Sequence, residues 1–406
     1  MQNNRKSICV LSFSTISNDA RVLRQIKYLS PHYDLNVVGY GAPKEAWTKQ
    51  ESVHCYPIDT FETKPPKSSL SRIMRRIINS LILGLGRFQP LLYEQWYWSR
   101  RHHIQALEYL TQSSCDGILA NDWEALPVAS EVAKRKNVKL VFDAHEYAPL
   151  EFEDSRSWQF FFKQAICYFI RKCSSDIHSS VTVSQPIAER YKQEFGFEPL
   201  VILNTPENIL LQERAVDFNN VRLVHHGMAI RDRKLENMIR ALAYSHPRFR
   251  LHFILMDRDS GYLSELKRLS EKLAPGRIIF ESPVRPEDIA ERISEYEIGF
   301  YLLKPTNFNN QMALPNKFFD YIMAGLAVCI GPSPAMAEMV HRYKLGWVAP
   351  SFEPREVAET INRITIDQIL SAWIAVREIT KEVNAETEMK KLVQTFNQLF
   401  NLKQSD

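Results

Sequence analysis

Pro-Asn-Lys-Phe-Phe-Asp-Tyr-Ile-Met-Ala-Gly-Leu-Ala-Val-Cys-Ile-Gly-Pro, from Pro315 to Pro332, is the stretch of the sequence that decides the fold. Pro315 suits the first turn of a helix, where its missing N–H is no loss, and Gly325 suits the position just after the last turn. Ala327 to Ile330 is a short apolar run, typical of a strand that is covered on both faces. The stretch therefore predicts a helix followed by a buried parallel strand.

Polar residues of this helix are expected to gather on one face. Asn316 and Lys317 precede Asp320 by four and three residues, so both share a side of the helix with Asp320, near the helix start. Helix N-termini beside a parallel sheet favour phosphate groups. The alternative is an ordinary surface ion pair between Lys317 and Asp320, worth a few tenths of a kcal/mol (about 0.2–0.5).

Composition indicates a globular protein with room for more than one domain. The chain has 406 residues, 45% of them hydrophobic and 24% charged, with a formal net charge of +4. This mild charge argues against a general nucleic-acid binder. The six cysteines lack metal-ligand spacing, which favours reduced core residues and a cytoplasmic location. The N-terminal residues do not show a signal-peptide pattern, and no apolar run reaches the roughly 18 residues of a membrane-spanning helix. We therefore expect neither a signal peptide nor a membrane span.

Strand and helix patterns alternate along both halves of the chain, which indicates parallel α/β sheets. In the first half, strands are expected at Ser7–Phe13, Leu35–Tyr40, Val53–Ile58, Gly117–Asn121, Lys139–Asp143, Val181–Ser184 and Val201–Leu203. In the second half, they are expected at Val221–His225, Leu251–Met256, Ile278–Phe280, Ile298–Leu303, Ala327–Ile330 and Gly346–Val348. The first strand-to-helix loop is not Gly-x-Gly-x-x-Gly, so a dinucleotide fingerprint is absent.

The repeat of this alternation predicts two domains and a final helix. We place the first domain at residues 1–207, the second at 208–385 and a C-terminal helix within 386–406, which could cross back to the first domain. The predicted class is α/β, with two facing Rossmann-like domains and a ligand site in the cleft between them.

Residues 63–93 interrupt the alternation with a basic amphipathic segment. It contains six Lys and Arg residues and no acidic residue: Lys64, Lys67, Arg72, Arg75, Arg76 and Arg87. Its apolar residues fall at helical spacing: Leu70, Ile73, Met74, Ile77, Ile78, Leu81, Ile82 and Leu85. Such a helix suits an anionic membrane surface. The alternatives are packing of its apolar stripe on the domain and binding of RNA, for which stacking aromatics on strands are missing.

Polar residues follow the strands of the first half. Asn121-Asp122 and Asp143-Ala-His145-Glu146 come at strand ends, where parallel sheets form their sites. A metal site is not expected here, because His145 and Glu146 would point to opposite faces of a strand. In the loop after the first strand, Asn18 or Asp19 can cap the following helix.

The loop after the first strand of the second half combines a glycine with cations. Gly227 would let the backbone approach a phosphate closely, and Arg233 and Lys234 would supply charge. The alternative is a basic turn at a helix start, an arrangement that the helix dipole disfavours. The polar loop Lys304–Gln311 precedes the helix of the opening stretch and is expected to touch the same ligand.

Together these segments resemble family-4 glycosyltransferases of the GT-B fold. The stretch from Pro315 to Val328 resembles the family's Pro-Asn-Lys-x-Phe-Glu-Tyr-x-x-Ala-Gly-x-Pro-Val, with Asp320 as the acid that holds the ribose and Ala327 in place of proline. Arg233 matches the phosphate-binding cation, whereas Lys234 replaces the usual glycine. Met312 stands where the family often has a glutamate that reads the donor sugar.

The resemblance also assigns residues in the first domain. His145 matches a histidine that lies against the donor's sugar and phosphate, and residues 18–22 resemble a loop that faces the acceptor. The expected acceptor-side residues are Asn18, Asp19, Asp122 and Glu146. The expected donor-side residues are Gly227, Arg233, Lys234, Asn316, Lys317 and Asp320, with His145 and Arg233 as the catalytic pair.

The resemblance implies transfer of a sugar from a nucleotide-diphosphate sugar, with retention of configuration and without a metal or other cofactor. The expected acceptor is a lipid-linked or polysaccharide intermediate of bacterial surface glycans such as capsule or lipopolysaccharide, and the expected location is cytoplasmic, peripheral on the inner face of the plasma membrane. Two alternatives stay open. One is a GT-B sugar-nucleotide epimerase that uses Asp122 and Glu146. The other is a non-catalytic, membrane-attached assembly subunit, which the change at Met312 favours.

Overall fold

The computed structural model describes residues 5–41, 51–59, 69–211, 214–259, 261–285, 288–312 and 314–402, without the side chains at 69–73, 75 and 76. The described residues up to Leu203, together with Asn307–Asn309 and those from Glu388 onward, form one compact unit. Asn204–Thr306 and Asn310–Thr387 form the second unit. The sequence places its boundary at residue 207, a few residues after the break between the units.

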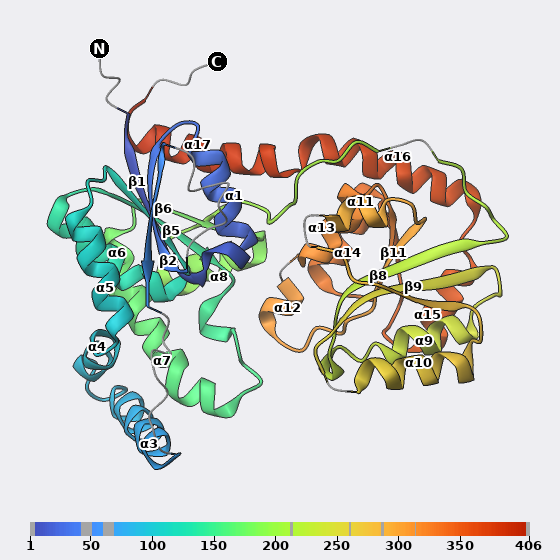
Figure 1. The fold of residues 1–406 in the computed structure, drawn as a ribbon, viewed down its shortest axis with the longest axis horizontal. Coiled ribbons are helices and arrows are strands. Elements are labelled where there is room, and N and C mark those ends of the chain that lie inside the picture. The colour runs from blue at the N-terminus through green and yellow to red at the C-terminus, as the bar shows by residue number, and fades with distance from the viewer. Residues whose placement is uncertain are drawn as a thin grey trace. The chain divides into compact units, whose positions relative to one another are not determined.

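The first unit is a parallel sheet covered by helices. Among the described residues, its 7-stranded sheet has the order β3-β2-β1-β4-β5-β6-β7, and every neighbouring pair is parallel. The strands are β1 Ser7–Thr15, β2 Asp34–Tyr40, β3 Val53–Ile58, β4 Gly117–Asn121, β5 Lys139–His145, β6 Ser179–Thr182 and β7 Leu200–Val201. The helices are α1 Ala20–Leu29, α3 Ser69–Leu85, α4 Leu91–Trp98, α5 Arg101–Gln112, α6 Asp122–Lys136, α7 Arg156–Cys173, α8 Gln185–Phe195 and α17 Ala385–Leu399. Figure 1 shows α5 and α6 on one face of the sheet and α1 on the other.

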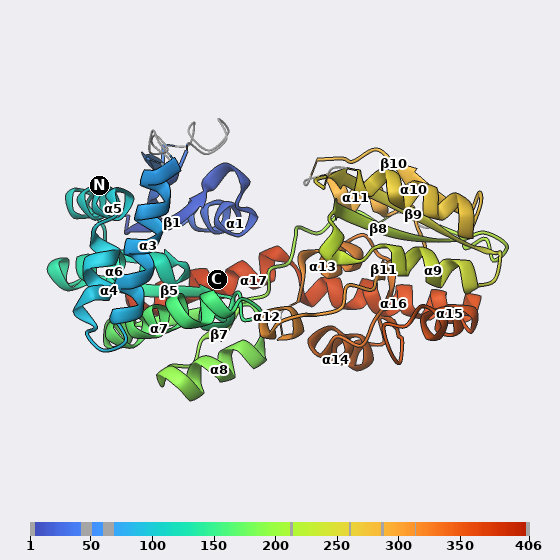
Figure 2. The same cartoon turned by 90° about the horizontal axis from the view of Figure 1, so that it is seen from below.

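The second unit repeats this architecture. Its described strands form a 6-stranded sheet in the order β10-β9-β8-β11-β12-β13, again with parallel neighbours throughout. The strands are β8 Val221–Ala229, β9 Phe249–Asp257, β10 Ile278–Glu281, β11 Ile298–Tyr301, β12 Ala327–Ile330 and β13 Gly346–Val348. The helices are α9 Glu236–Tyr244, α10 Tyr262–Leu273, α11 Ile289–Ile293, α13 Asn316–Met323, α14 Pro334–Tyr343, α15 Pro354–Asn362 and α16 Ile366–Glu382. Figures 1 and 2 show α9 and α10 beside β9.

The opening stretch folds as a helix and a buried strand. All four residues of β12 are fully buried. Gly325, which follows the C-cap residue Ala324 of α13, has a φ of 73°, and this explains a glycine at that position. Pro315 differs from the expectation. It is the N-cap residue with extended backbone rather than part of the first turn, and the helix begins at Asn316. The reason is local, because a proline ring also fits the φ of −69° that this cap adopts.

The last helix, α17, packs on the first sheet. Its buried residues Met389, Leu392, Val393 and Phe396 belong to the same apolar core as β1 and β2. The hydroxyl of Tyr33 donates a hydrogen bond to Asn397 Oδ1 at 2.6 Å. The C-terminal end of the chain thus completes the core of the unit in which the N-terminal strand lies.

The segment Lys304–Gln311, expected as a loop, contains a short helix, α12 Phe308–Met312. Asn309 within it is buried, and its side chain bonds both backbone groups of Tyr147. Tyr147 N donates to Asn309 Oδ1 at 2.8 Å, and Asn309 Nδ2 donates to Tyr147 O at 3.1 Å. The side chain of Asn309 is therefore already used within the first unit, and the expected contact of the segment Lys304–Gln311 with a donor stays a prediction.

Candidate active site

Three of the predicted donor-side residues converge at the end of β8. Gly227 has a φ of 133°, and a methyl group built on it would lie 2.4 Å from Lys317 Cε and 3.1 Å from Arg233 Nη1. The lysine comes from the first turn of α13, and the arginine from the 3-10 turn Arg231–Arg233. The arrangement therefore places two cations directly beside the backbone of Gly227, and converging cations are what an anion-binding site requires.

The two cations disfavour each other in the absence of an anion. The pKa of Lys317 is lowered to about 8, first by burial and then by the charge of Arg233, and only Asp320 acts in the opposite direction. Burial also lowers the pKa of Arg233. Within the described part of the chain, neither cation forms a salt bridge with a carboxylate. A bound diphosphate would relieve this repulsion.

The carboxylate of Asp320 lies beside a histidine of β8, in place of the surface ion pair with Lys317 that the sequence left open. Its Oδ2 lies 3.4 Å from Nε2 of His226, a buried residue of β8. Burial and then Lys317 hold the pKa of His226 well below its usual range. The carboxylate is partly exposed, so it can accept hydrogen bonds from a ligand on its open side.

Asn316 and Lys234 contribute less directly. Asn316 is exposed, and its Oδ1 accepts a hydrogen bond from Asn204 Nδ2 at 2.8 Å. Lys234 is exposed and has a φ of 47°, the left-handed conformation. This backbone explains the glycine that the resemblance gives at position 234, because glycine adopts such a φ without strain.

Replacing Lys234 by glycine should raise the free energy of unfolding by up to about 1 kcal/mol, since it removes the cost of a left-handed lysine. Donor affinity should change less than twofold. Chemical unfolding and a donor titration of the variant check both values. A loss of affinity of tenfold or more would instead give the Lys234 ammonium a direct role in the site.

His225, next to the anion site, gives a pH-dependent stability. It is fully buried, with Nδ1 2.9 Å from Phe300 O, and its pKa is lowered to about 3 by burial, Lys317 and Arg233. The unfolded chain therefore binds one more proton than the folded chain between about pH 3 and 6.5. The stabilisation is complete above pH 6.5 and is lost as the pH falls.

Replacing His225 by phenylalanine should flatten the dependence of unfolding free energy on pH by up to about 1.4 kcal/mol per pH unit. Urea unfolding at pH 5, 6 and 7 measures the slope. The exposed His341, replaced by glutamine, is the control. An unchanged slope in H225F would contradict a neutral, buried His225.

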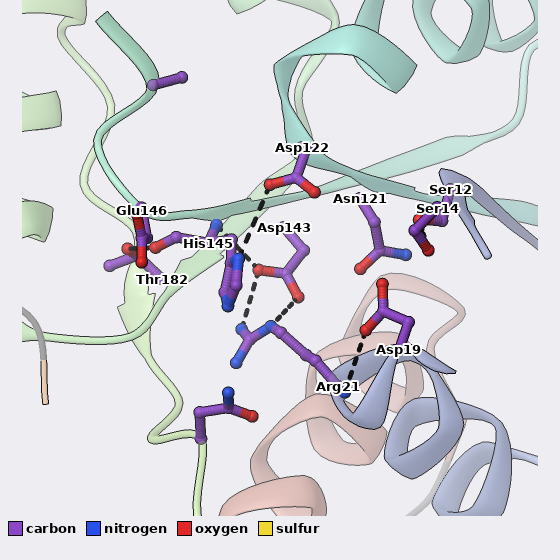
Figure 3. Close-up of polar contacts among 12 residues, drawn as sticks. Ser12, Ser14, Asp19, Arg21, Asn121, Asp122, Asp143, His145, Glu146 and Thr182 are labelled. Carbon is purple, nitrogen blue, oxygen red and sulfur yellow. Dashed lines mark hydrogen bonds and ion pairs between the residues drawn. The ribbon is translucent and has the colours of Figure 1, made fainter. Parts of the chain in front are cut away.

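Two left-handed residues mark the corresponding edge of the first sheet. Asp122 and His145 have φ values of 63° and 52°, directly after β4 and at the end of β5. Asp122 Oδ1 lies 3.8 Å from His145 Nδ1 (Figure 3). Glu146 follows His145 and is half-buried, and burial raises the pKa of its carboxyl. The structure therefore brings these three predicted residues to one place.

The loop after β1 supplies the remaining predicted residues. Asp19 is the cap of α1, and its Oδ1 accepts hydrogen bonds from the backbone N–H of Arg21 and Val22, both at 3.1 Å. Asn18 is exposed and ends the 3-10 turn Ile16–Asn18. The capping role thus falls to Asp19, and Asn18 keeps its side chain available to a ligand.

His145 is a neutral group in this environment. Burial, and next the charge of Arg21, lowers its pKa to about 4. Asp122, although half-exposed, has a pKa well above its usual range, through desolvation and the charges of Asp143 and Asp19. At neutral pH the contact between His145 and Asp122 is therefore polar rather than an ion pair of two fixed charges, which suits hydrogen bonding to sugar hydroxyls.

Sequence patterns placed Asn121 and Asp143 at strand ends and Arg21 in the loop segment 18–22, but they missed Gln25 and the network that these four residues form beneath His145. Arg21, Gln25, Asn121 and Asp143 are all buried and joined by hydrogen bonds. Arg21 and Gln25 are four residues apart and share the buried face of α1 with Val22 and Ile26. Two polar residues at apolar helical spacing are the signal that could have found them.

One group of potential metal ligands lies elsewhere in the described part of the first unit. Glu124 Oε1 is 3.1 Å from His103 Nε2 and 3.7 Å from His102 Nε2. The guanidinium of Arg100 lies 2.9 Å from the same oxygen. A cation already occupies this carboxylate, so the cluster is better described as an ion-pair network than as a metal centre.

The two parallel α/β units define the GT-B fold of glycosyltransferases. A structure of Anabaena Alr3699/HepE in complex with UDP and glucose is similar to this chain with a TM-score of 0.65 and 16% identity, covering 97% of this chain and 100% of that one. Sucrose-phosphate synthase from Thermosynechococcus elongatus is similar with a TM-score of 0.69, 13% identity and coverage of 98% and 100%. A glycosyltransferase from Rickettsia africae is similar with a TM-score of 0.66 and 11% identity, covering 98% of this chain and 100% of that one.

These similarities show the fold. A scan against protein-family models finds no match. A search of curated proteins also finds none.

Proposed function

We propose that the protein transfers a sugar from a nucleotide-diphosphate sugar to an acceptor. The observation that carries this proposal is the convergence of Lys317 and Arg233 on Gly227, without a carboxylate salt bridge to either cation among the described residues. The donor's diphosphate would bind there, and Asp320 would accept hydrogen bonds from the ribose. The complex of Alr3699/HepE with UDP and glucose supports this donor class.

The two cations also provide the chemistry. As the bond between sugar and diphosphate breaks, negative charge grows on the leaving oxygen, and preplaced cations stabilise it without reorganisation. This is the role that a divalent metal would otherwise fill, so the proposal includes no metal or other cofactor. Retention of configuration belongs to the proposal through the family resemblance.

The first unit would hold the acceptor and the donor's sugar. His145 would form hydrogen bonds with sugar hydroxyls as a neutral imidazole, and Asp122 and Glu146 would contact the acceptor. Asn18 and Asp19 would line the same side. These polar groups lie at the carboxyl edge of β1, β4 and β5, where parallel sheets place their ligands.

The test is donor turnover and product identity with UDP-, GDP-, ADP- and CMP-sugars. The proposal expects one donor to be consumed, with its sugar transferred or, without acceptor, slowly released to water. Interconversion of the sugar while it stays on the nucleotide would establish the epimerase alternative. Binding without any turnover would favour the assembly subunit.

We also propose a lipid-linked acceptor at an anionic membrane surface. Large apolar side chains are exposed along α3 and after it: Met74, Ile77, Ile78, Leu81, Leu85, Phe88 and Leu91. Phe88 is 89% exposed, next to Arg87, whose guanidinium lies 4.8 Å from the Phe160 ring centroid. The alternative, in which this stripe packs on the domain, does not account for these exposed side chains.

Part of the basic segment lies outside the described residues. This applies to Lys64 and Lys67, and to the side chains of Arg72, Arg75 and Arg76. No helix among the described residues is long and apolar enough to cross a bilayer. The proposed attachment is therefore to the surface, by partial insertion of apolar side chains beside cations.

Sedimentation with vesicles tests this attachment. Wild type should bind phosphatidylglycerol vesicles more strongly than phosphatidylcholine vesicles, and the double variant Leu81→Ser/Phe88→Ser should lose most of this binding. The matched control is Ile374→Ser, on α16 of the second unit, which removes a side chain that is 65% exposed. Equal sedimentation of all three proteins would contradict a membrane role for α3.

A further inference from the structure

A buried ion pair lies directly beneath the end of β5. Arg21, on α1, donates from Nε to Asp143 Oδ2 at 2.6 Å and from Nη2 to Asp143 Oδ1 at 2.8 Å (Figure 3). Arg21 is 5% exposed and Asp143 is not exposed at all. This two-point geometry fixes the plane of the carboxylate, which a lysine could not do.

Gln25 extends the pair to the next strand. Its Nε2 donates to Asp143 Oδ2 at 2.6 Å and to Asn121 Oδ1 at 2.8 Å, and the side chain is 1% exposed. Asn121 is the last residue of β4 and immediately precedes Asp122. The network therefore ties together the ends of the two strands that carry the first unit's candidate site residues.

The same carboxylate reaches the backbone of His145. His145 N donates to Asp143 Oδ1 at 3.1 Å, and Thr182 Oγ1 donates to His145 O at 2.6 Å. Between Asp143 and His145 the register of β5 against β6 shifts, and His145 takes its left-handed φ of 52°. A residue with a side chain holds such a conformation only when its surroundings impose it.

We propose that Arg21 and Gln25, acting through Asp143, are positioning residues that hold His145 in the orientation needed for sugar transfer. The inference rests on the proposed function, because the orientation of His145 matters for sugar transfer only if the first unit contacts the sugar. The pair connects Arg21 and Gln25 to His145, because the carboxylate of Asp143 accepts from both side chains and from His145 N.

Burial and, after it, the charges around His145 determine the charge state of its imidazole. Burial, Arg21 and Arg24 favour the neutral imidazole, whereas Asp143 and Asp19 favour the cation. The charged or titratable groups that face His145 are Asp122 at the start of α6, Asp143 on its own strand, and Asp19, Arg21 and Arg24 at or before α1. The balance keeps the imidazole neutral at pH 7, as a hydrogen-bonding group.

The test compares two variants with a matched control. Arg21→Lys keeps the positive charge but loses the two-point hydrogen bonding to Asp143. Gln25→Leu keeps a side chain of similar size but removes the hydrogen bonds of Gln25 to Asp143 and Asn121. Each should lower kcat by about 10- to 100-fold, the effect of a misplaced group, with donor KM changed less than threefold. The control is Arg222→Lys, which alters a two-point pair with Glu297 in the second unit.

NMR titration of the His145 ring is the second measurement, and it does not depend on turnover. The ring signals and the apparent pKa of His145 should shift in R21K and Q25L but not in R222K. Folded R21K and Q25L proteins with wild-type kcat and an unchanged His145 titration would overturn the inference. If wild type itself transfers no sugar, the proposed function fails, and the titration alone then decides whether the network positions His145.

Discussion

Replacing Lys317 by methionine should weaken nucleotide-sugar binding by about 10- to 150-fold, the loss of one charge-assisted hydrogen bond of roughly 1.5–3 kcal/mol. Arg233→Met should have a similar effect. The ligand-free protein should lose no stability in K317M, because the ammonium is half-buried beside Arg233 and has a lowered pKa. Loss of binding together with retained stability is the mark of a residue kept for its ligand.

The matched control for this prediction is Arg231→Met. Arg231 lies on the same 3-10 turn, two residues before Arg233, and pairs with Glu265 at 2.6 Å. Calorimetric titration measures the affinity and thermal unfolding measures the stability. Equal loss of affinity in R231M and K317M would show a general effect of positive charge and contradict a specific diphosphate site.

Replacing His145 by alanine should lower kcat by roughly 100- to 1,000-fold, as removal of one preorganised polar group at a reacting centre does. Donor affinity should change much less, because the proposed diphosphate site lies in the second unit. In wild type, protonation of His145 near pH 4 would remove its acceptor lone pair, so activity should fall as the pH drops below about 5.

Steady-state kinetics from pH 4.5 to 8 check this second prediction. His32→Ala, an exposed histidine of the first unit, is the control and should keep the wild-type profile. A variant H145A with near-normal kcat would remove His145 from the mechanism. Wild-type activity that rises as the pH falls from 6 to 4.5 would contradict a neutral imidazole as the working form.

Local sequence rules predicted the parts of the fold that depend on neighbouring residues. The apolar run Ala327–Ile330 is a buried strand, and Gly325 ends its helix with a positive φ, because both features follow from spacing and backbone sterics. The meeting of Gly227, Arg233 and Lys317 was also predictable, since strand ends and helix starts of a parallel sheet share one edge.

Contacts between distant residues were not predictable in the same way. Arg21 and Asp143 are 122 positions apart, so spacing cannot indicate that their side chains meet. The proximity of Asp320 to His226 of β8 is likewise a tertiary fact, because the two residues are far apart in the sequence. Within the polar segment Lys304–Gln311, Asn309 is buried and bonds Tyr147, because polarity in a sequence does not distinguish a binding loop from a buried contact.

Calorimetric titration of the wild-type protein with UDP-, GDP-, ADP- and CMP-sugars tests the central claim most directly. The proposed site predicts saturable binding of one nucleotide class at one site per chain, weakened at least tenfold in K317M and unchanged in R231M. Absence of binding by every one of these donors, in protein that is folded by circular dichroism, would contradict the account.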